Sequence, residues 1–303
     1  MTEPKTRSVV TIGTFDGIHV GHRALLQKTR ELAEANRFQS VVLTFPRPPQ
    51  NYLGNPKRLL MPPEKRIALL TQHVDQVLVI EFPEIQSLSP REFVKEILCE
   101  RLKAAAVVVG RNFCFGRDRQ GNVSTLMELG SGLGIDVQIV DPILVNGERV
   151  SSTTIRQALQ VGDIERASRL LGDPPKLWGK VIPGEGQGRV LGFPTANLSM
   201  NSELLVPGEG IYATRVFYRN QSKMASLYIG RRPTFDGAHT SIEVHILESD
   251  SHEELDLYGE ELSVQLFTRL RGDRRFSSRE ELQAQIRADV EATQEFFSSR
   301  IRE

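Results

Sequence analysis

The sequence contains little cysteine and no long apolar run, and these two absences exclude several classes of protein. The 303 residues include two cysteines, Cys99 and Cys114, which are too few for a disulfide framework or a four-cysteine zinc site. We interpret them as reduced thiols, as expected in the cytoplasm. No apolar run approaches the roughly 20 residues that span a bilayer, and the polar first residues lack the apolar core of a signal peptide. We therefore expect a cytoplasmic protein with no membrane partner.

The sequence also lacks an excess of charge of either sign. It has 38 basic and 38 acidic residues, so its formal net charge is zero. A protein that binds nucleic acid through phosphates usually carries a basic surplus, and we expect no nucleic-acid partner. Its 39% hydrophobic and 25% charged residues are typical of a globular protein. A chain of this length predicts about two domains. No pattern in the sequence specifies an oligomeric state.

Strand and helix signals alternate through the first half of the chain. The predicted strands cover 9–12, 41–45, 77–80, 105–109 and 137–140, and the predicted helices cover 22–34, 64–73 and 90–102. Strands that are apolar throughout and alternate with helices form a parallel sheet covered on both faces. We expect an α/β domain of the Rossmann-like class over residues 1–172.

The pattern changes after Gly172, where the sequence Gly-Asp-Pro-Pro predicts a linker. Short strands dominate beyond it, at 177–182, 211–217, 225–229, 241–247 and 262–267, and a helix covers 278–298. Around Val244 the residues alternate between an apolar face and a polar face that carries Glu243 and His245. Many short strands without intervening helices predict a small antiparallel barrel. We expect a mainly β domain with a terminal helix over residues 173–303.

The first chemical motif is GTFDGIHVGH at 13–22, between a predicted strand and a predicted helix. Doubly wound sheets bind nucleotides at this position, because glycines allow close approach to phosphate and the helix N-terminus offers free N–H groups. His19 and His22 are three residues apart, so they share a face if the first helical turn includes both. Two imidazoles there can donate hydrogen bonds to a transferring phosphoryl group. The alternatives are two structural histidines, or a zinc site for which the cysteines have no suitable spacing.

This motif resembles the signature of the nucleotidyltransferase superfamily, and its longer form resembles the prokaryotic bifunctional riboflavin kinase/FAD synthetase family. Two later segments are similar to that family's next motifs, GRNFCFG at 110–116 and VSSTTIR at 150–156. The resemblance implies that His19 and His22 act in adenylyl transfer and that Asn112 contacts the nucleotide or flavin. It implies ATP or phosphate contacts for Gly13, Phe15, Asp16, Gly17, Ser152, Thr153 and Arg156.

The third of these motifs also has a chemical rationale of its own. Hydroxyl residues at a predicted helix start cap the helix and bind phosphate. Arg156 is a permanent cation that can hold the β- and γ-phosphates of ATP. The alternative interpretation is an ordinary capped helix with a surface arginine.

The second chemical site follows a glycine-rich loop that contains Gly184 and Gly188. Such a loop can fold over phosphates. Thr195 and Asn197 are two residues apart, so in an extended segment their side chains point the same way. A hydroxyl and an amide oxygen are hard ligands that suit the Mg²⁺ of Mg·ATP. From the residues alone, a structural loop beside a strand would be the favoured interpretation.

The segment GRVLGFPTAN at 188–197 resembles the riboflavin kinase signature. The resemblance implies ATP contacts for Gly184, Gly188 and Arg189, and metal ligation by Thr195 and Asn197. No GK[ST] sequence occurs, so this is not a Walker A loop.

Two further residues receive a function from the same resemblance. Glu243 would otherwise be a solvated strand residue, and it matches the general base that takes the proton of the riboflavin hydroxyl. Arg271 would contact flavin or phosphate, although a basic surface turn is an alternative. Two positions depart from the family pattern: Arg47 and Pro48 follow Pro46 where the family often has a histidine between prolines, and Tyr228 replaces a usual asparagine.

The resemblance covers about 9–289 and implies two activities in one chain. Riboflavin would be phosphorylated in the barrel to FMN, and FMN would be adenylylated to FAD on the first domain with release of pyrophosphate. Both reactions would use ATP with Mg²⁺. The competing hypotheses are a kinase with a degenerate first domain, which the intact histidine motif argues against, and a non-catalytic flavin-binding protein, which the presence of Glu243, Thr195 and Asn197 argues against.

Overall fold

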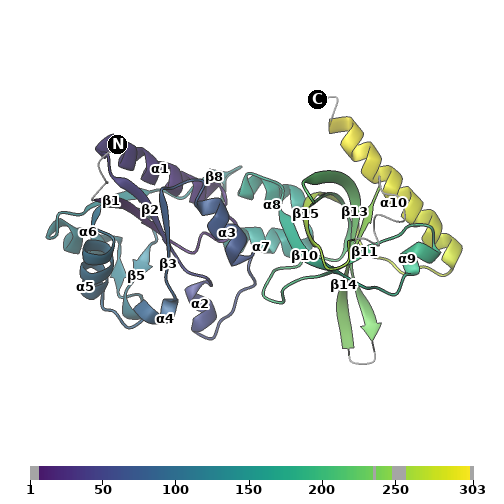
Figure 1. Cartoon of the computed structure of the whole chain (residues 1–303), viewed down its shortest axis with the longest axis horizontal. Coiled ribbons are helices and arrows are strands. Elements are labelled where there is room, and N and C mark those ends of the chain that lie inside the picture. Colours follow the sequence, from purple (N-terminus) through teal and green to yellow (C-terminus); the bar gives the residue numbers. More distant parts are fainter. Residues whose placement is uncertain (1–6, 235–236, 248–256, 301–303) are drawn as a thin grey trace. The chain divides into compact units, whose positions relative to one another are not determined.

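The computed structural model describes residues 7–234, 237–247 and 257–300, and the chain divides into two compact units, 1–152 and 153–303 (Figure 1). The first is an α/β unit and the second is a β-barrel with helices, so the expected fold classes are confirmed. In the described part of the chain, no helix is both long enough and apolar enough to cross a membrane.

The first unit is built on a five-stranded parallel sheet with the order β3-β2-β1-β4-β7. Its strands are β1 (Ser8–Ile12), β2 (Gln39–Thr44), β3 (Gln76–Val79), β4 (Ala104–Gly110) and β7 (Asp136–Val140). The strand order reverses between β1 and β4, whose side chains are almost all buried. In sheets of this kind, ligands usually bind beyond the carboxyl ends of the two strands at which the order reverses.

Helices cover both faces of this sheet. Successive residues of β1 point to opposite faces, so Val9 and Val10 pack against different helices. Val9 packs on one face against α1 (Val20–Asn36), together with Ala33 and Val108. Val10 packs on the other face, in a larger apolar cluster with helical residues such as Phe93 and Leu126. The helices of this unit include α3 (Pro63–Leu70), α5 (Pro90–Glu92) and α6 (Val123–Ser131).

The helix predicted over 90–102 differs from an ordinary α-helix. After the capping box of Ser89 and Glu92, it continues as the π-helix η1 (Phe93–Arg101). The amide of Leu102 donates to the carbonyl of Ile97, five residues back, at 3.0 Å. The wider turn brings Phe93, Ile97 and Leu102 to the same buried face. In this segment the helix that packs against the sheet is a π-helix, whereas the amphipathic pattern of the sequence indicated an ordinary α-helix.

Short elements complete the first unit. They are α2 (Pro49–Tyr52), α4 (Phe82–Ile85), β5 (Cys114–Phe115), η2 (Arg117–Arg119), β6 (Gly121–Asn122), β8 (Leu144–Val145) and β9 (Glu148–Arg149). β5 pairs with β6 and β8 with β9, each antiparallel.

The second unit contains a closed antiparallel barrel with the order β10-β11-β14-β13-β12-β15. Its strands are β10 (Lys176–Ile182), β11 (Ala196–Ser199), β12 (Gly210–Tyr218), β13 (Gln221–Thr234), β14 (Gly237–Ile246) and β15 (Glu261–Arg271). The paired row of Ala196, Val244, Leu227 and Tyr212 is fully buried and forms the barrel interior. The predicted alternation around Val244 is confirmed. β11 was not predicted as a strand, because its four residues are too few to show a period.

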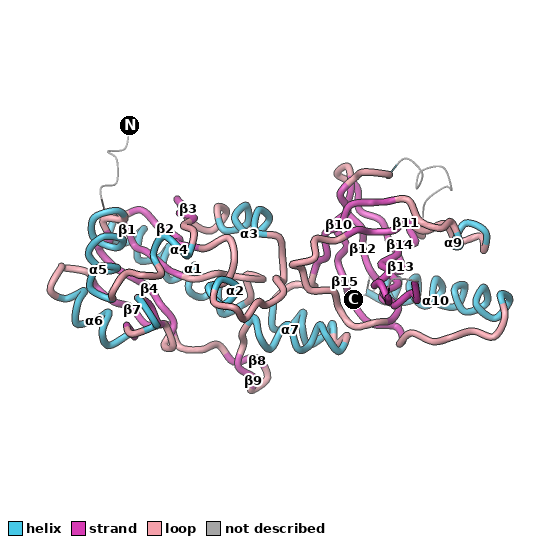
Figure 2. Tube along the Cα trace, turned by 90° about the horizontal axis from the view of Figure 1, so that it is seen from below, coloured by secondary structure: helices cyan, strands magenta, loops and turns pink. Residues whose placement is uncertain are grey.

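The terminal helix α10 (Arg279–Arg300) packs on the outer face of the barrel (Figure 2). Phe297 and Thr293 are buried there, and the hydroxyls of Thr293 and Ser226 lie 2.8 Å apart. At the N-terminus, the hydroxyl of Ser278 accepts from the amide of Glu281 at 3.1 Å. The capping box that Ser278 and Glu281 could form is only half formed, since the carboxylate of Glu281 accepts from the amide and hydroxyl of Ser277 instead.

Two helices, α7 (Ser152–Val161) and α8 (Ile164–Leu171), precede the barrel, and α8 packs on β15. The guanidinium of Arg269 on β15 donates to the carbonyls of Val161 and Glu209. The compact units divide between Ser152 and Thr153, directly after the first residue of α7, so nearly all of both helices belongs to the second unit. The sequence-derived boundary at 172/173 follows them and stays a prediction about where the two catalytic domains divide.

The turn between α7 and α8 generates a stability prediction. Gly162 has a φ of +79°, and a β-carbon there would lie 2.7 Å from Cδ of Arg269 and 3.0 Å from the Tyr212 hydroxyl oxygen. We expect Gly162→Ala to lower the free energy of unfolding by more than the about 1–2 kcal/mol of a left-handed backbone, because the added clash has to be relieved. Urea unfolding measures the loss.

Gly259→Ala is the matched control for this change. Gly259 has a φ of +85°, and the nearest atom to a β-carbon there is 3.8 Å away, so this variant carries the backbone cost without the clash. Equal losses in the two variants would show that the contact with Arg269 does not restrict the turn.

Candidate active sites

The first candidate site lies where the strand order of the sheet reverses. The loop after β1 leads into α1, and His19 is the N-cap of that helix. Its Nδ1 accepts a hydrogen bond from the backbone amide of His22 at 3.2 Å. A neutral imidazole that accepts at Nδ1 carries its proton at Nε2. The cap therefore fixes His19, which is 6% exposed, as a hydrogen-bond donor through Nε2.

His22 lies one turn further along, and its ring stacks on that of His19 with centroids 3.5 Å apart and planes 12° apart. Burial lowers the pKa of His22 well below its ordinary value, and the nearby His19 and Arg66 lower it further. The structure therefore brings the two predicted histidines together, with His22 held neutral at pH 7. Neutral imidazoles contribute oriented N–H dipoles to a phosphate site, rather than full charge.

The loop between Gly13 and His19 has an unusual backbone. Phe15, Gly17 and Ile18 have φ values of 55°, 86° and 40°, which is costly for the two residues with side chains. The ring of Phe15 is buried beneath Gly13, where a β-carbon would lie 3.2 Å from it. The buried ring of Phe15 thus packs against Gly13 within the same strained loop.

Asp16 and Ser152 support this loop through hydrogen bonds. The buried carboxylate of Asp16 accepts from the amide of Leu60 at 3.0 and 3.1 Å. The hydroxyl of Ser152 donates to the carbonyl of Asp16 at 2.9 Å. These contacts join three segments distant in sequence, and they give both side chains partners within the protein.

Arg66 belongs to this site, although it was not among the predicted residues. It is fully buried on α3, and its Nη2 donates to the carbonyls of Phe45 and Pro46 at 2.5 and 2.9 Å. Burial lowers the pKa of Arg66, while the nearby Asp16 and Glu64 oppose that shift. One feature of the sequence could have indicated its burial. Arg66 lies four positions before Leu70, so the two residues share the apolar face of the helix.

Asn112 follows β4, on the other side of the strand reversal. In the amide orientation that satisfies both side chains, its oxygen accepts from Nη1 and Nη2 of Arg149 at 3.0 and 2.6 Å. Its nitrogen is then directed elsewhere as a donor. Arg149, like Arg66, was not among the predicted site residues. Thr153 and Arg156, by contrast, lie on α7 in the second unit.

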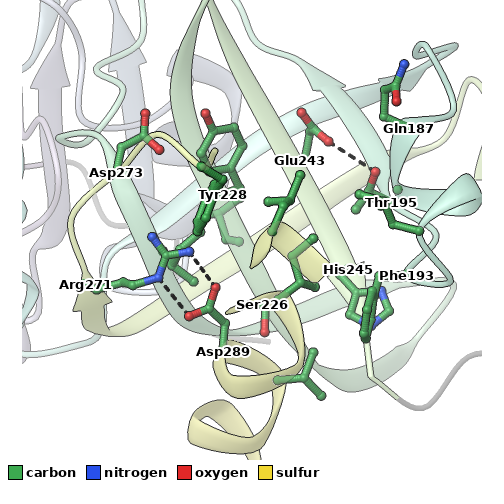
Figure 3. A pocket seen from close by; sticks show the side chains of 18 of the residues that line it. Gln187, Phe193, Thr195, Ser226, Tyr228, Glu243, His245, Arg271, Asp273 and Asp289 are labelled. Carbon is green, nitrogen blue, oxygen red and sulfur yellow. Dashed lines mark hydrogen bonds and ion pairs between the residues drawn. The ribbon is translucent and has the colours of Figure 1, made fainter. Parts of the chain in front are cut away.

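The second candidate site is a row of side chains across the outer wall of the barrel. Strand register pairs Arg271 with Ile211, Ile211 with Tyr228, Tyr228 with Glu243, and Glu243 with Asn197. Residues paired directly across strands point to the same face. Four of these five line a cavity of about 310 Å³ between the barrel wall and α10 (Figure 3).

Glu243 stands near the middle of this row and is 8% exposed. One carboxylate oxygen accepts from the hydroxyl of Thr195 at 3.2 Å, and the other accepts from the hydroxyl of Ser241 at 2.8 Å. The structure therefore brings the predicted carboxylate and the predicted metal-binding threonine into contact. Glu243 lies in a covered cavity rather than in solvent.

The glycine-rich loop packs directly on these residues. A side chain at Gly184 would overlap the amide of Asn197, and one at Gly188 would overlap the carbonyl of Phe193 and the hydroxyl of Thr195. The loop contains the short helix α9 (Gln187–Val190), on which Arg189 is exposed. Helix α10 holds the end of this loop, because Gln283 donates to the carbonyl of Leu191 at 3.0 Å.

Two more polar side chains complete the cavity wall. The guanidinium of Arg271 forms a double hydrogen bond with the carboxylate of Asp289 on α10, at 2.9 and 2.7 Å. Nδ1 of His245 lies 2.7 Å from the carbonyl of Pro194. Burial lowers the pKa of His245, so the neutral ring donates from Nδ1 and fixes the residue before Thr195. Its position two residues after Glu243, on the same strand face, was the sequence signal for it.

The fold and the two sites together define a class of protein. A glycine loop with two imidazoles at the reversal of a Rossmann-like sheet suits nucleotidyl transfer. A buried carboxylate beside Thr195 and a glycine-rich loop suits phosphoryl transfer to a hydroxyl. The chain is a nucleotide-dependent transferase with two separate sites.

Comparisons with known proteins identify the family. Residues 1–154 match the FAD synthetase family, and residues 171–297 match the riboflavin kinase family. The bifunctional riboflavin kinase/FMN adenylyltransferase of Escherichia coli (strain K12) is 36% identical over 299 residues, covering 97% of this chain and 94% of the relative. That of Bacillus subtilis (strain 168) is 32% identical over 305 residues, covering 98% and 95%. The chain therefore belongs to the family of bifunctional riboflavin kinase/FMN adenylyltransferases.

A solved structure extends the similarity to the whole fold. It is described as a macrolide-efflux protein from Streptococcus pneumoniae, and it is similar to this chain with a TM-score of 0.86 and 31% identity, covering 97% of this chain and 95% of that one. Both units of the fold therefore recur in it.

The neutral state of His22 generates a pH prediction. Below pH 6.5 the unfolded chain binds a proton at this position while the folded protein does not, so the free energy of unfolding decreases as the pH falls. We expect His22→Asn to remove this part of the decrease. Urea unfolding at pH 7.5 and 5.5 measures it in both proteins. The pKa values of His73 and His245 are also lowered, but both residues remain in the variant and affect both proteins alike. An unchanged pH dependence in the variant would therefore contradict the buried neutral state of His22.

Proposed function

We propose that the barrel phosphorylates riboflavin with Mg·ATP, and that the N-terminal domain adenylylates the resulting FMN with a second Mg·ATP. The observation that carries the kinase assignment is the buried carboxylate of Glu243, which faces the cavity and contacts Thr195. The observation that carries the transferase assignment is the stacked pair of His19 and His22 at the start of α1. The free cysteines Cys99 and Cys114 suit the cytoplasm as the compartment.

In the kinase step, Glu243 acts as the general base. It takes the proton of the terminal ribityl hydroxyl while that oxygen attacks the γ-phosphorus of ATP. The new bond joins the ribityl oxygen to the γ-phosphorus, the bond from the γ-phosphorus to the bridging oxygen breaks, and ADP leaves. The hydroxyls of Thr195 and Ser241, which both donate to the carboxylate, hold it in place for proton transfer.

The donor set next to Glu243 fits a hard divalent cation. Thr195 and Asn197 offer a hydroxyl and an amide oxygen, and both lie directly against the glycine-rich loop that would cover the phosphates. These residues would hold the Mg²⁺ of Mg·ATP, which offsets the phosphate charge when bound. Gly184 and Gly188 permit the close packing, because a side chain at either position would overlap Asn197 or Thr195.

In the adenylyl step, a phosphate oxygen of FMN attacks the α-phosphorus of ATP. The new bond joins the two phosphates, the bond between the α-phosphorus and its bridging oxygen breaks, and pyrophosphate leaves. His19 donates through Nε2 to the developing negative charge, and His22 adds a second dipole. Gly13 and Gly17 bring the backbone close to the phosphates, and Asn112 contacts the nucleotide or flavin. The family resemblance further assigns phosphate contacts to Ser152, Thr153 and Arg156.

Replacing Glu243 by glutamine tests the kinase assignment. The change keeps the shape of the side chain but removes the base, so we expect FMN formation to fall by at least about a hundredfold. Conversion of FMN to FAD should be unchanged. Chromatographic time courses that start from riboflavin and from FMN measure both steps on one preparation, and loss of both activities in a folded variant would refute the two-site assignment.

The double change His19→Ala and His22→Ala is the reciprocal test. We expect FAD formation from FMN to be lost because the donors to the α-phosphate are gone, while FMN formation from riboflavin continues. The retained kinase activity reports that the variant is folded. Continued FAD formation at the wild-type rate would remove these histidines from the proposed mechanism.

Asn197→Ala tests the metal site. We expect the Mg²⁺ concentration for half-maximal FMN formation to rise several-fold, because one ligand is lost, while the Mg²⁺ dependence of FAD formation stays the same. Chelation of divalent cations with EDTA should stop both reactions. A variant with the wild-type Mg²⁺ dependence in the kinase step would exclude Asn197 as a ligand.

A further inference from the structure

Tyr228 occupies the position next to Glu243 in the row across the barrel wall. The two residues are directly paired between β13 and β14, and both line the cavity (Figure 3). Paired side chains in an antiparallel sheet have β-carbons about 5 Å apart. A ligand ring that contacts Tyr228 therefore lies close enough to Glu243 for a short chain attached to that ring to reach the carboxylate.

The ring of Tyr228 lies along the wall of the cavity. A β-carbon at Gly230, two residues further on the same strand face, would overlap the hydroxyl, Cζ and Cε2 atoms of the tyrosine. The outer half of the ring thus fills the space that a side chain at Gly230 would occupy. Tyr228 therefore contributes aromatic surface to the wall of the cavity.

Helix α10 supplies the opposite wall. Leu282, Ile286 and Val290 are spaced at four-residue intervals, are half-buried and line the same cavity, so they form one apolar stripe. An aromatic wall and an aliphatic wall enclose a space suited to a flat, largely apolar ring system. The Arg271–Asp289 pair lies on the side of Tyr228 away from Glu243.

From this arrangement we propose that Tyr228 is a specificity-determining residue of the acceptor site, whose ring stacks on the fused ring system of riboflavin and places its ribityl chain against Glu243. This inference rests on the proposed kinase function and extends it to a residue that departs from the family pattern. An asparagine, which the family resemblance leads us to expect at this position, offers no comparable aromatic surface.

Flavin fluorescence tests the contact without turnover. A phenol stacked on an excited flavin donates an electron to it and quenches its emission, whereas a phenyl ring does so much less. Riboflavin is titrated into the protein with Mg·ADP present. We expect strong quenching in the wild type, retained affinity but brighter bound flavin in Tyr228→Phe, and roughly tenfold weaker binding in Tyr228→Asn, the size expected for loss of an aromatic stack.

Tyr258→Asn is the matched control, since Tyr258 is 51% exposed in the same unit and does not line the cavity. It should leave riboflavin binding and quenching unchanged. The KM for ATP should be unchanged in both Tyr228 variants, while the KM for riboflavin rises in Tyr228→Asn alone. Wild-type affinity in Tyr228→Asn, or equal quenching in Tyr228→Phe and the wild type, would overturn the proposal.

The two proposals can fail separately. If the wild type binds and quenches riboflavin but forms no FMN, the kinase assignment fails and the stacking contact stands. If FMN forms and both Tyr228 variants behave like the wild type, the stacking proposal fails alone.

Discussion

The pairing of β11 with β14 involves two residue pairs, Ala196 with Val244 and Asn197 with Glu243, and much of the second unit depends on it. It closes the barrel, because β11 also pairs with β10. It places Ala196 and Val244 in the interior and Asn197 beside Glu243 on the outer wall. A shift of one residue would exchange these faces, burying the polar pair and exposing the apolar one. The apolar interior thus fixes the register that assembles the polar site.

Helix α10 connects the two halves of the kinase site. Its apolar stripe faces the cavity, Asp289 holds Arg271, and Gln283 donates to the carbonyl of Leu191 at the end of the glycine-rich loop. Asp289 is buried, and a buried ion pair is stable only when its geometry satisfies both charges. The double hydrogen bond and the further donor from Gln285 meet that condition. The acceptor cavity and the phosphate loop therefore share one rigid support.

The two sites rely on different physical devices. In the first unit, a helix cap fixes the tautomer of His19, and burial keeps His22 neutral. In the second unit, two hydroxyls hold a buried carboxylate. The first arrangement presents N–H dipoles to an anionic phosphate, whereas the second presents a proton acceptor to an alcohol. The N–H dipoles suit the negative charge that develops on the phosphate, and the carboxylate suits the proton that leaves the hydroxyl.

The sequence by itself determined the alternation of elements, the parallel sheet, the barrel and the positions of both motifs, because apolar periodicity and glycine spacing are local properties of the chain. It also placed Glu243 on the polar face of its strand. Local patterns did not reveal β11, the π-helical turns of η1, or the support that Arg66, Arg149 and His245 give to the sites. Those features arise from contacts between distant segments, and only the tertiary structure decided that Tyr228 and Glu243 share one covered cavity.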